Sequence, residues 1–165
     1  MNAIILAAGS GKRIREDVKD LPKSLLTVNG KPIITYQIQA LKQAGINDII
    51  VITGAHSEKF EIENVRYIKD HHYNEHDILG SLLEAKDFLK NDVLVLYSDI
   101  IFESKILRQI LDSKGDVSIA IDMAWEKMYE GRMEHPKYEA ENVQLNKAKK
   151  IIKIKKNIEN KNNDV

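Results

Sequence analysis

Glycines and cations lie directly behind the first apolar run of the chain. The run Leu6-Ala7-Ala8 leads into Gly9-Ser10-Gly11, and Lys12-Arg13 follows at once. Glycines allow the backbone to approach a ligand closely and to direct several N–H groups toward it. Such amides beside positive side chains form an anion site, and the usual anion there is a phosphate. The alternative is a glycine turn that carries solvated basic residues.

The two common phosphate-binding motifs do not fit this loop. A P-loop requires glycine five residues before Gly11, where Leu6 stands, and serine or threonine where Arg13 stands. The dinucleotide fingerprint requires a third small residue in place of Ile14. The segment instead continues to a second cation, Lys23, which follows a proline that stiffens the backbone. We therefore expect a phosphate site of another kind.

Asp99 is the sharpest single candidate for a metal ligand. It follows the apolar run 93–97, which predicts a buried strand that delivers the carboxylate to the edge of a crevice. A carboxylate oxygen in that place suits a magnesium ion. The alternative is an aspartate that caps the next helix. The phosphate site predicted at the first loop favours the metal interpretation.

Strands and helices alternate along the first two thirds of the chain. Apolar runs predict strands at residues 3–8, 48–53, 65–68, 93–97 and 117–121. Helical spacing predicts helices at residues 32–44, 78–89 and 104–111. This alternation indicates an α/β fold with a largely parallel sheet covered on both faces. Ligands of such sheets lie at the carboxyl ends of the strands, so Gly9, Thr53-Gly54 and Asp99 are expected to share one crevice.

The last third has a different character. Residues 125–139 are polar with scattered aromatics and predict a long loop with some helix. Residues 142–145 and 151–154 predict an antiparallel pair around a turn at Asn146.

Composition limits the class of protein. The chain has 165 residues, 43% of them hydrophobic, which is enough for one domain with a sizeable core. Lysine plus arginine and aspartate plus glutamate both total 25, so no net field attracts nucleic acid or an anionic membrane. The absence of cysteine and of a long apolar run fits a cytoplasmic protein with neither nucleic acid nor membrane as partner.

Three segments together resemble the nucleotidyltransferase family that activates phosphorylated sugars and alcohols. They are residues 6–13, Leu21-Pro22-Lys23-Ser24-Leu25, and Val28-Asn29-Gly30-Lys31-Pro32-Ile33. The resemblance implies a three-layer α/β/α fold with a Rossmann-like, mostly parallel (mixed) sheet of the nucleotide-diphospho-sugar transferase type. It also implies that Asp99 binds the catalytic Mg²⁺ and that Lys23 matches a family lysine.

The residues then take definite roles in binding a nucleoside triphosphate. Lys12 and Arg13 would neutralise the β- and γ-phosphates, and Lys23 would stabilise charge at the α-phosphate or hold the acceptor. For each cation the alternative is ordinary exposed charge. The nucleotide site is expected to comprise Leu6, Ala7, Ala8, Gly9, Ser10, Gly11, Thr53, Gly54, Gly80 and Ser81.

The segment 76–82 starts a helix with two small residues, Gly80 and Ser81. Tight helix packing and a ligand role are both open for them. In the resembling family a serine like Ser81 lies near the nucleotide, but the family often has asparagine where Asp77 stands. His71, His72 and His76 are not expected to bind zinc, because the chain lacks cysteine and the helical spacing is poor.

A second group of residues could bind the acceptor. Aromatic rings beside carboxylates suit a cationic group, and an arginine suits a phosphate or phosphonate. The alternative is a wet loop with ordinary surface residues. The order of aromatic, basic and acidic residues in the segment 125–141 resembles that of phosphocholine and aminoethylphosphonate cytidylyltransferases. This resemblance implies that the acceptor is bound by Trp125, Tyr129, Arg132, Glu139 and Glu141, with His135 nearby.

The sequence thus predicts a Mg²⁺-dependent nucleotidyltransferase that uses CTP and a phosphorylated or phosphonate small molecule. Two alternatives stay open: a sugar-1-phosphate nucleotidyltransferase with another triphosphate, and a non-catalytic nucleotide-binding module. Residues 1–156 are expected to form the domain and 157–165 a frayed tail. The family's second metal-binding aspartate has no match after Lys155, which suggests a C-terminally truncated domain. A homodimer is left open.

Overall fold

The computed structural model describes residues 1–9, 20–131 and 137–156. Contacts within the chain divide it into two compact units, residues 1–114 and 115–165, and each is described here by itself. Among the described residues, no helix combines the length and the apolar character needed to cross a membrane.

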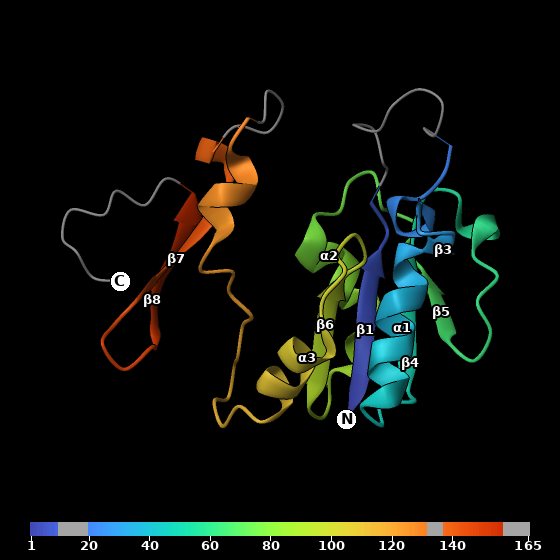
Figure 1. Cartoon of the computed structure of the whole chain (residues 1–165). Helices are drawn as coiled ribbons and strands as arrows, with labels where there is room; N and C mark the ends of the chain where they lie inside the picture. Colours follow the sequence, from blue (N-terminus) through green and yellow to red (C-terminus); the bar gives the residue numbers. More distant parts are fainter. Residues whose placement is uncertain (10–19, 132–136, 157–165) are drawn as a thin grey trace. The chain divides into compact units, whose positions relative to one another are not determined.

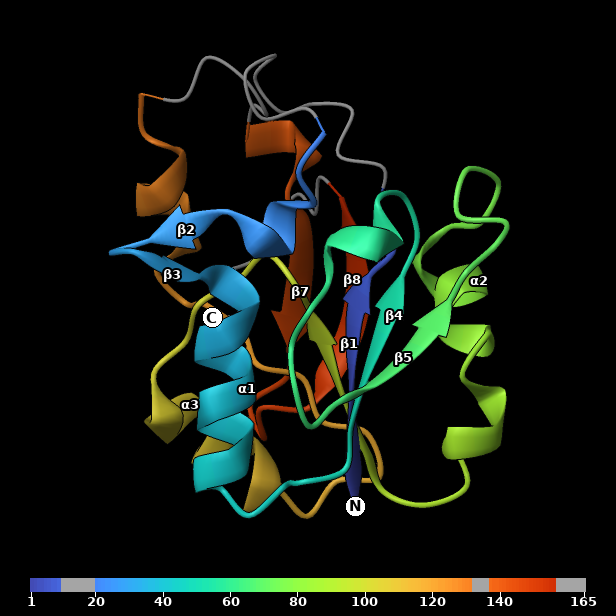
Figure 2. The same ribbon diagram turned by 90° about the vertical axis from the view of Figure 1, so that its right-hand side faces the viewer.

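The first unit is built on a sheet of four parallel strands (Figures 1 and 2). Their order across the sheet is β5-β4-β1-β6, and they comprise β1 (Asn2–Ala7), β4 (Ile49–Thr53), β5 (Arg66–Lys69) and β6 (Val93–Tyr97). The central strand β1 places Ile5 between Val51 of β4 and Leu96 of β6. Four of the five predicted strands are therefore confirmed, and the apolar runs that predicted them form the core of the sheet.

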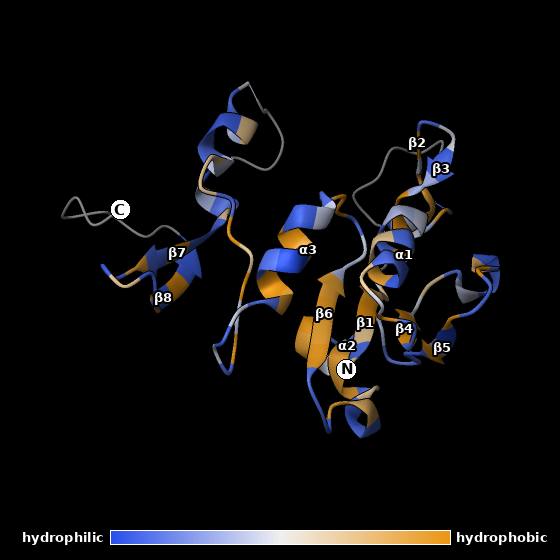
Figure 3. Ribbon diagram, turned by 60° about the horizontal axis from the view of Figure 1, so that its bottom comes forward, coloured by the Kyte–Doolittle hydropathy of each residue, from blue (hydrophilic) through white to orange (hydrophobic). Residues whose placement is uncertain are grey.

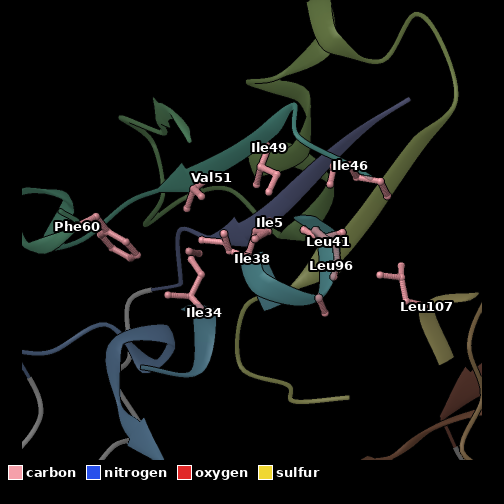
Figure 4. Packing of buried hydrophobic residues seen from close by; sticks show 13 residues of the cluster. Ile5, Ile34, Ile38, Leu41, Ile46, Ile49, Val51, Phe60, Leu96 and Leu107 are labelled. Carbon is pink, nitrogen blue, oxygen red and sulfur yellow. The ribbon is translucent and has the colours of Figure 1, made fainter. Parts of the chain in front are cut away.

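Alternate residues of the sheet face two separate hydrophobic layers. On one face Ile5, Val51 and Leu96 pack against helices α1 (Ile33–Gln43) and α3 (Ser104–Leu111), as Figure 4 shows. On the other face Ile4 and Ile50 pack against α2 (Ile78–Leu83) and the 3-10 turn η4 (Lys86–Phe88). The predicted three-layer α/β/α arrangement is confirmed.

A tight hairpin precedes α1. Strands β2 (Thr27–Val28) and β3 (Lys31–Pro32) pair antiparallel around Asn29 and Gly30, which both have positive φ, 50° and 74°. Two consecutive positive φ values are typical of the type I′ hairpin turn that Asn-Gly favours. The 3-10 turn η2 (Lys23–Leu25) comes just before this hairpin, and η3 (Ser57–Lys59) follows β4.

Two predicted elements differ in the structure. The helix expected at 78–89 ends at Leu83, because the next backbone bonds run to residues three back and bury Ala85 against the sheet. Leu79 and Leu83 of this segment are 60% and 50% exposed. The strand expected at 117–121 is not formed: no described strand pairs with it, and Val117 is 83% exposed. An apolar run becomes a strand only when a neighbour satisfies its backbone.

Strand β6 is an edge strand and is not buried on both faces as the sequence suggested. Its hydrophobic character is visible along its length in Figure 3. Leu96 lies in the core, but Val95 and Tyr97 on the opposite face are 43% and 48% exposed. The strand that carries the candidate metal ligand therefore has one solvent-facing side.

The second unit contains short helical turns and a hairpin. Turns η5 (Trp125–Tyr129) and η6 (Lys137–Glu139) precede strands β7 (Glu141–Leu145) and β8 (Ile151–Lys156). The two strands pair antiparallel, and the side-chain oxygen of Asn146 accepts hydrogen bonds from the backbone N–H groups of Ala148 and Lys150. The predicted antiparallel pair around Asn146 is confirmed, with each strand slightly longer than expected.

Candidate functional site

Three strand ends meet at the carboxyl edge of the first unit's sheet. Gly9 lies just beyond β1, Gly54 beyond β4 and Asp99 beyond β6. Because β1 lies between β4 and β6, these three positions are neighbours across the sheet. The backbone N–H of Ser98 donates to the carbonyl of Leu6 at 3.3 Å and continues the β1–β6 pairing toward Asp99. The topology thus brings together the positions that the sequence placed in one crevice.

Gly54 allows the ends of β1 and β4 to pack closely together. A Cβ atom at this position would lie 2.3 Å from the carbonyl oxygen of Ala8 and 2.7 Å from Cβ of Tyr73. Backbone and ring cannot both yield, so only glycine fits here. Ala8 is only 5% exposed for the same reason. The sequence analysis did not identify Tyr73 as part of this edge.

Lys23 reaches the carboxylate of Asp99 from the turn η2. The distance from Lys23 Nζ to Asp99 Oδ2 is 4.0 Å, and the two side chains are 39% and 49% exposed. The turn is anchored beneath, because Ser24 is buried and Leu25 packs against the core. A cation and a carboxylate from separate segments therefore face one another at an accessible edge. This is the arrangement expected of a site for a phosphate and its metal ion.

The turn that carries Asp99 is held by a single buried amide. Gln37 of α1 donates from Nε2 to the carbonyl of Tyr97 at 2.8 Å and to that of Ile100 at 2.7 Å. The residue is 1% exposed, so its two hydrogen bonds are shielded from water. A glutamine among the buried residues of a helix signals a polar partner, so Gln37 could have been noticed from the sequence.

A second polar centre surrounds Asp70, directly after β5. Its side chain is fully buried and accepts hydrogen bonds from Ser81 Oγ at 2.7 Å and from the backbone N–H of His72 at 2.8 Å. Burial acts to raise the pKa of Asp70, but these hydrogen bonds and the nearby His76 outweigh it and lower the pKa. Asp70 is thus kept as a buried anion.

This centre defines the surroundings of Gly80 and Ser81. Ser81 is buried, and its hydroxyl is used by Asp70. A Cβ on Gly80 would lie 2.9 Å from both Cβ and Cγ of His76, so the small residue makes room for the imidazole. Asp77 caps α2 by accepting from the backbone N–H of Gly80 at 2.8 Å. Gly80 thus makes room for His76 and Ser81 hydrogen-bonds to Asp70, while a nucleotide-binding role for either stays a prediction.

Thr53 is likewise enclosed. It is 2% exposed, and its hydroxyl lies 3.5 Å from the carbonyl of Ile68. The strand residues Leu6 and Ala7 lie on β1 within the sheet. These three residues shape the edge through their backbone.

Several predicted site residues lie outside the described residues. They are Ser10, Gly11, Lys12, Arg13, Arg132 and His135. Their roles stay predictions.

The acceptor candidates of the second unit form a small aromatic group. The rings of Trp125 and Tyr129 meet edge to face, with centroids 5.6 Å apart. Lys137 places its Nζ 5.5 Å from the Trp125 ring and 2.6 Å from a carboxylate oxygen of Glu126. The Trp125 ring therefore already faces a cation. Of the two predicted carboxylates, Glu139 ends the turn η6 and Glu141 begins β7.

Comparisons with known proteins point in one direction. The model of the MobA-like NTP transferase domain matches residues 3–141. A CTP:phosphoglutamine cytidylyltransferase of Campylobacter jejuni is 33% identical over an alignment of 158 residues, which covers 88% of this chain and 62% of that protein.

Solved structures agree with this match. The CTP:phosphocholine cytidylyltransferase of Streptococcus pneumoniae is 43% identical with a TM-score of 0.56, over 59% of this chain and 44% of that one. An inositol-1-phosphate CTP transferase of T. maritima, at 19% identity, has a TM-score of 0.69 over 95% of this chain and 64% of that one, and shows the fold. The chain spans less than two thirds of each of these three proteins.

Proposed function

Because this chain belongs to the MobA-like NTP transferase domain family, we propose that it transfers a cytidylyl group from CTP to a phosphorylated or phosphonate small molecule and releases pyrophosphate. The observation that carries the proposal is the pair Lys23 and Asp99, 4.0 Å apart at the carboxyl edge of a parallel sheet. The choice of CTP rests on the Campylobacter jejuni and Streptococcus pneumoniae cytidylyltransferases described above.

The reaction needs positioning and charge neutralisation more than a protein nucleophile. An acceptor oxygen attacks the α-phosphorus in line, the bond to the bridging oxygen breaks, and pyrophosphate leaves with that electron pair. Lys23 stabilises the charge that develops on the α-phosphate. Lys12 and Arg13, which follow Gly9 closely in the sequence, would neutralise the β- and γ-phosphates. No covalent enzyme intermediate is required.

A magnesium ion fits the chemistry of Asp99. Magnesium prefers a few carboxylate oxygens together with substrate phosphates and water. Asp99 offers such an oxygen at an accessible edge, and the positive charge of Lys23, 4.0 Å from it, supports this assignment. Asp99 would hold the ion, which when bound supplies Lewis-acid neutralisation of the triphosphate.

The acceptor would use the aromatic group of the second unit. Lys137 already places a cation near the Trp125 ring, so a ligand ammonium group could take the same kind of position. Glu139 and Glu141 add negative charge to that unit, and Arg132 would meet the acceptor's phosphate. An acceptor that carries both a cationic group and a phosphate therefore suits these residues best.

The test is a matrix of triphosphates and acceptors scored by pyrophosphate release. We expect turnover with CTP, Mg²⁺ and phosphocholine or a related phosphorylated acceptor, and much less with ATP, GTP or UTP. Preference for a sugar 1-phosphate and another triphosphate would replace the acceptor and base assigned here. Calorimetry with CTP and Mg²⁺ on the same samples gives the binding affinity. Binding without turnover would indicate a nucleotide-binding module. Absence of CTP binding would contradict the proposal.

A further inference from the structure

Polar side chains from two segments converge on one face of the Asp70 centre. Asp70, His72 and His76 come from the loop after β5, and Glu84 lies at the end of α2. One ligand atom from each of these four residues lies within 4.8 Å of every other. We propose that they form a binding site for one divalent transition-metal ion of the zinc type, separate from the magnesium assigned to Asp99.

The buried carboxylate provides the fixed point of this site. Asp70 is fully buried, and its two oxygens are oriented by Ser81 Oγ and by the backbone N–H of His72. Carboxylates that bind metal ions are characteristically held by hydrogen bonds of this kind from outside the ligand set. A buried anion also requires a compensating positive charge, which a divalent ion supplies.

The spacing of the donor atoms of Asp70, His76 and Glu84 suits a metal ion. In a tetrahedral zinc site with bonds of about 2.0–2.1 Å, neighbouring ligand atoms lie about 3.3–3.4 Å apart. His76 Nδ1 is 3.0 Å from Asp70 Oδ1 and 3.9 Å from Glu84 Oε1. These two distances lie on either side of that value. Both distances, and the limit of 4.8 Å that holds for every pair of the four donors, are compatible with a shared ion after small side-chain rotations.

The backbone presents the two histidines together. The N–H of His76 donates to the carbonyl of His72 at 2.9 Å, which forms one turn and leaves the two ring centroids 5.5 Å apart. Gly80 provides the space that the His76 ring occupies. His72 is exposed and can rotate to complete the fourth position. His71 and Glu75 in the same loop are not among the clustered donors.

The donor set selects the metal. Two imidazoles and two carboxylates suit Zn²⁺ and its neighbours, whereas Mg²⁺ prefers oxygen ligands alone. Cysteine is therefore unnecessary at this site, although its absence and the poor helical spacing of the histidines led the sequence to predict no zinc. A metal bound in this place would join the loop 70–76 to α2 beside the carboxyl edge.

The experiment titrates Zn²⁺ into tag-free protein from which metals have been removed with a chelator. Calorimetry and equilibrium dialysis should show one saturable equivalent per chain, and Co²⁺ should give the intense visible bands of a tetrahedral site. We expect His72→Ala and Glu84→Gln to weaken binding about 10- to 100-fold. Both side chains are exposed, so these variants should fold normally.

Two control variants separate this site from other metal binding. His71→Ala removes an exposed histidine of the same loop and should leave the Zn²⁺ affinity unchanged. Asp99→Asn removes the proposed magnesium ligand and should also leave it unchanged, so failure here is distinct from failure of the proposed function. Absence of saturable Zn²⁺ binding, or equal loss in His71→Ala and His72→Ala, would overturn the proposal and leave His76 as an ion-pair partner of Asp70.

Discussion

Lys23 and Asp99 are the residues on which a chemical role can be tested most directly. We expect Lys23→Ala to lower the rate of pyrophosphate release by about 100- to 1,000-fold, since removal of one preorganised group that stabilises transition-state charge has an effect of that size. The melting temperature should hardly change, because the Lys23 side chain is substantially exposed. Steady-state kinetics and thermal unfolding of the same samples provide the two measurements.

Lys90→Ala is a matched control for this substitution. Lys90 is also exposed, but it precedes β6 and so lies toward the amino end of the strand that carries Asp99. Its loss should leave turnover unchanged. If Lys23→Ala turned over as fast as Lys90→Ala, Lys23 would have no part in the mechanism.

Ionisation of Tyr67 is expected to lower the free energy of unfolding at alkaline pH. Burial raises its pKa, and the hydroxyl both accepts from the backbone N–H of Ile62 at 2.8 Å and donates to the Ile62 carbonyl at 3.1 Å. A raised pKa in the folded state favours the neutral phenol. The stability that Tyr67 contributes is therefore complete below a pH of about 10 and is lost as the pH rises through the folded-state pKa.

Urea unfolding of the wild type and Tyr67→Phe tests this expectation. Near neutral pH the wild type should be more stable by about 1 kcal/mol, because phenylalanine cannot form the hydrogen bonds to Ile62. That difference should shrink as the pH rises past about 10. A difference in unfolding free energy that is constant with pH would contradict the assigned shift.

At the scale of elements, α1 positions the site through Gln37. We expect Gln37→Met, which keeps the side-chain volume, to cost about 1–2 kcal/mol of stability for the two hydrogen bonds to Tyr97 and Ile100. The carboxylate of Asp99 should then be less precisely held. The catalytic constant should fall by more than the affinity for CTP.

Kinetics and calorimetry distinguish positioning from a purely structural effect. Ile38→Val, in the same helix and also in the core, should cost about 0.5–1.5 kcal/mol without changing the ratio of the catalytic constant to the CTP affinity. Equal changes in that ratio for both variants would remove Gln37 from its positioning role.

Local signals predicted the parallel elements well. The apolar run that became β4 is fully buried and that of β1 is buried except at half-buried Leu6, and such runs indicate buried strands. Asn29 and Gly30 both favour the positive φ values that a type I′ turn requires, so the hairpin around them could also be predicted.

Features that depend on distant partners could not be predicted in this way. Val117 belongs to an apolar run but has no paired neighbour among the described strands, and α2 is cut short by the burial of Ala85. The Gln37 clamp and the grouping of Asp70 with Glu84 arise from contacts between distant elements. Within the candidate site, the meeting of Gly9, Gly54 and Asp99 followed from strand direction, whereas Tyr73 carried no signal in the sequence.

At the scale of the whole molecule, the first unit holds a complete core. Among the residues that the structure describes, both hydrophobic clusters consist of residues before position 114, and the last of them is Leu111 of α3. We expect residues 1–114 to unfold cooperatively on their own, because both hydrophobic clusters are formed within this segment even though one side of β6 is exposed. Circular dichroism and urea unfolding of the 1–114 fragment measure this.

A shorter fragment provides the contrast. Residues 1–103 lack α3 and so expose the core face that Leu107 covers. Loss of a buried leucine alone costs about 2–5 kcal/mol, so this fragment should be much less stable than 1–114. If 1–114 showed no cooperative transition, the core of the first unit would not suffice for folding.

The single amide of Gln37 joins both sides of the Asp99 turn to one helix. A ligand that displaces the backbone of this turn must therefore move α1 with it or break two shielded hydrogen bonds. Conversely, a small slide of α1 along its axis would withdraw the carboxylate from Lys23. The position of α1 and that of the Asp99 backbone are thus coupled, and the coupling depends on Gln37, which is buried.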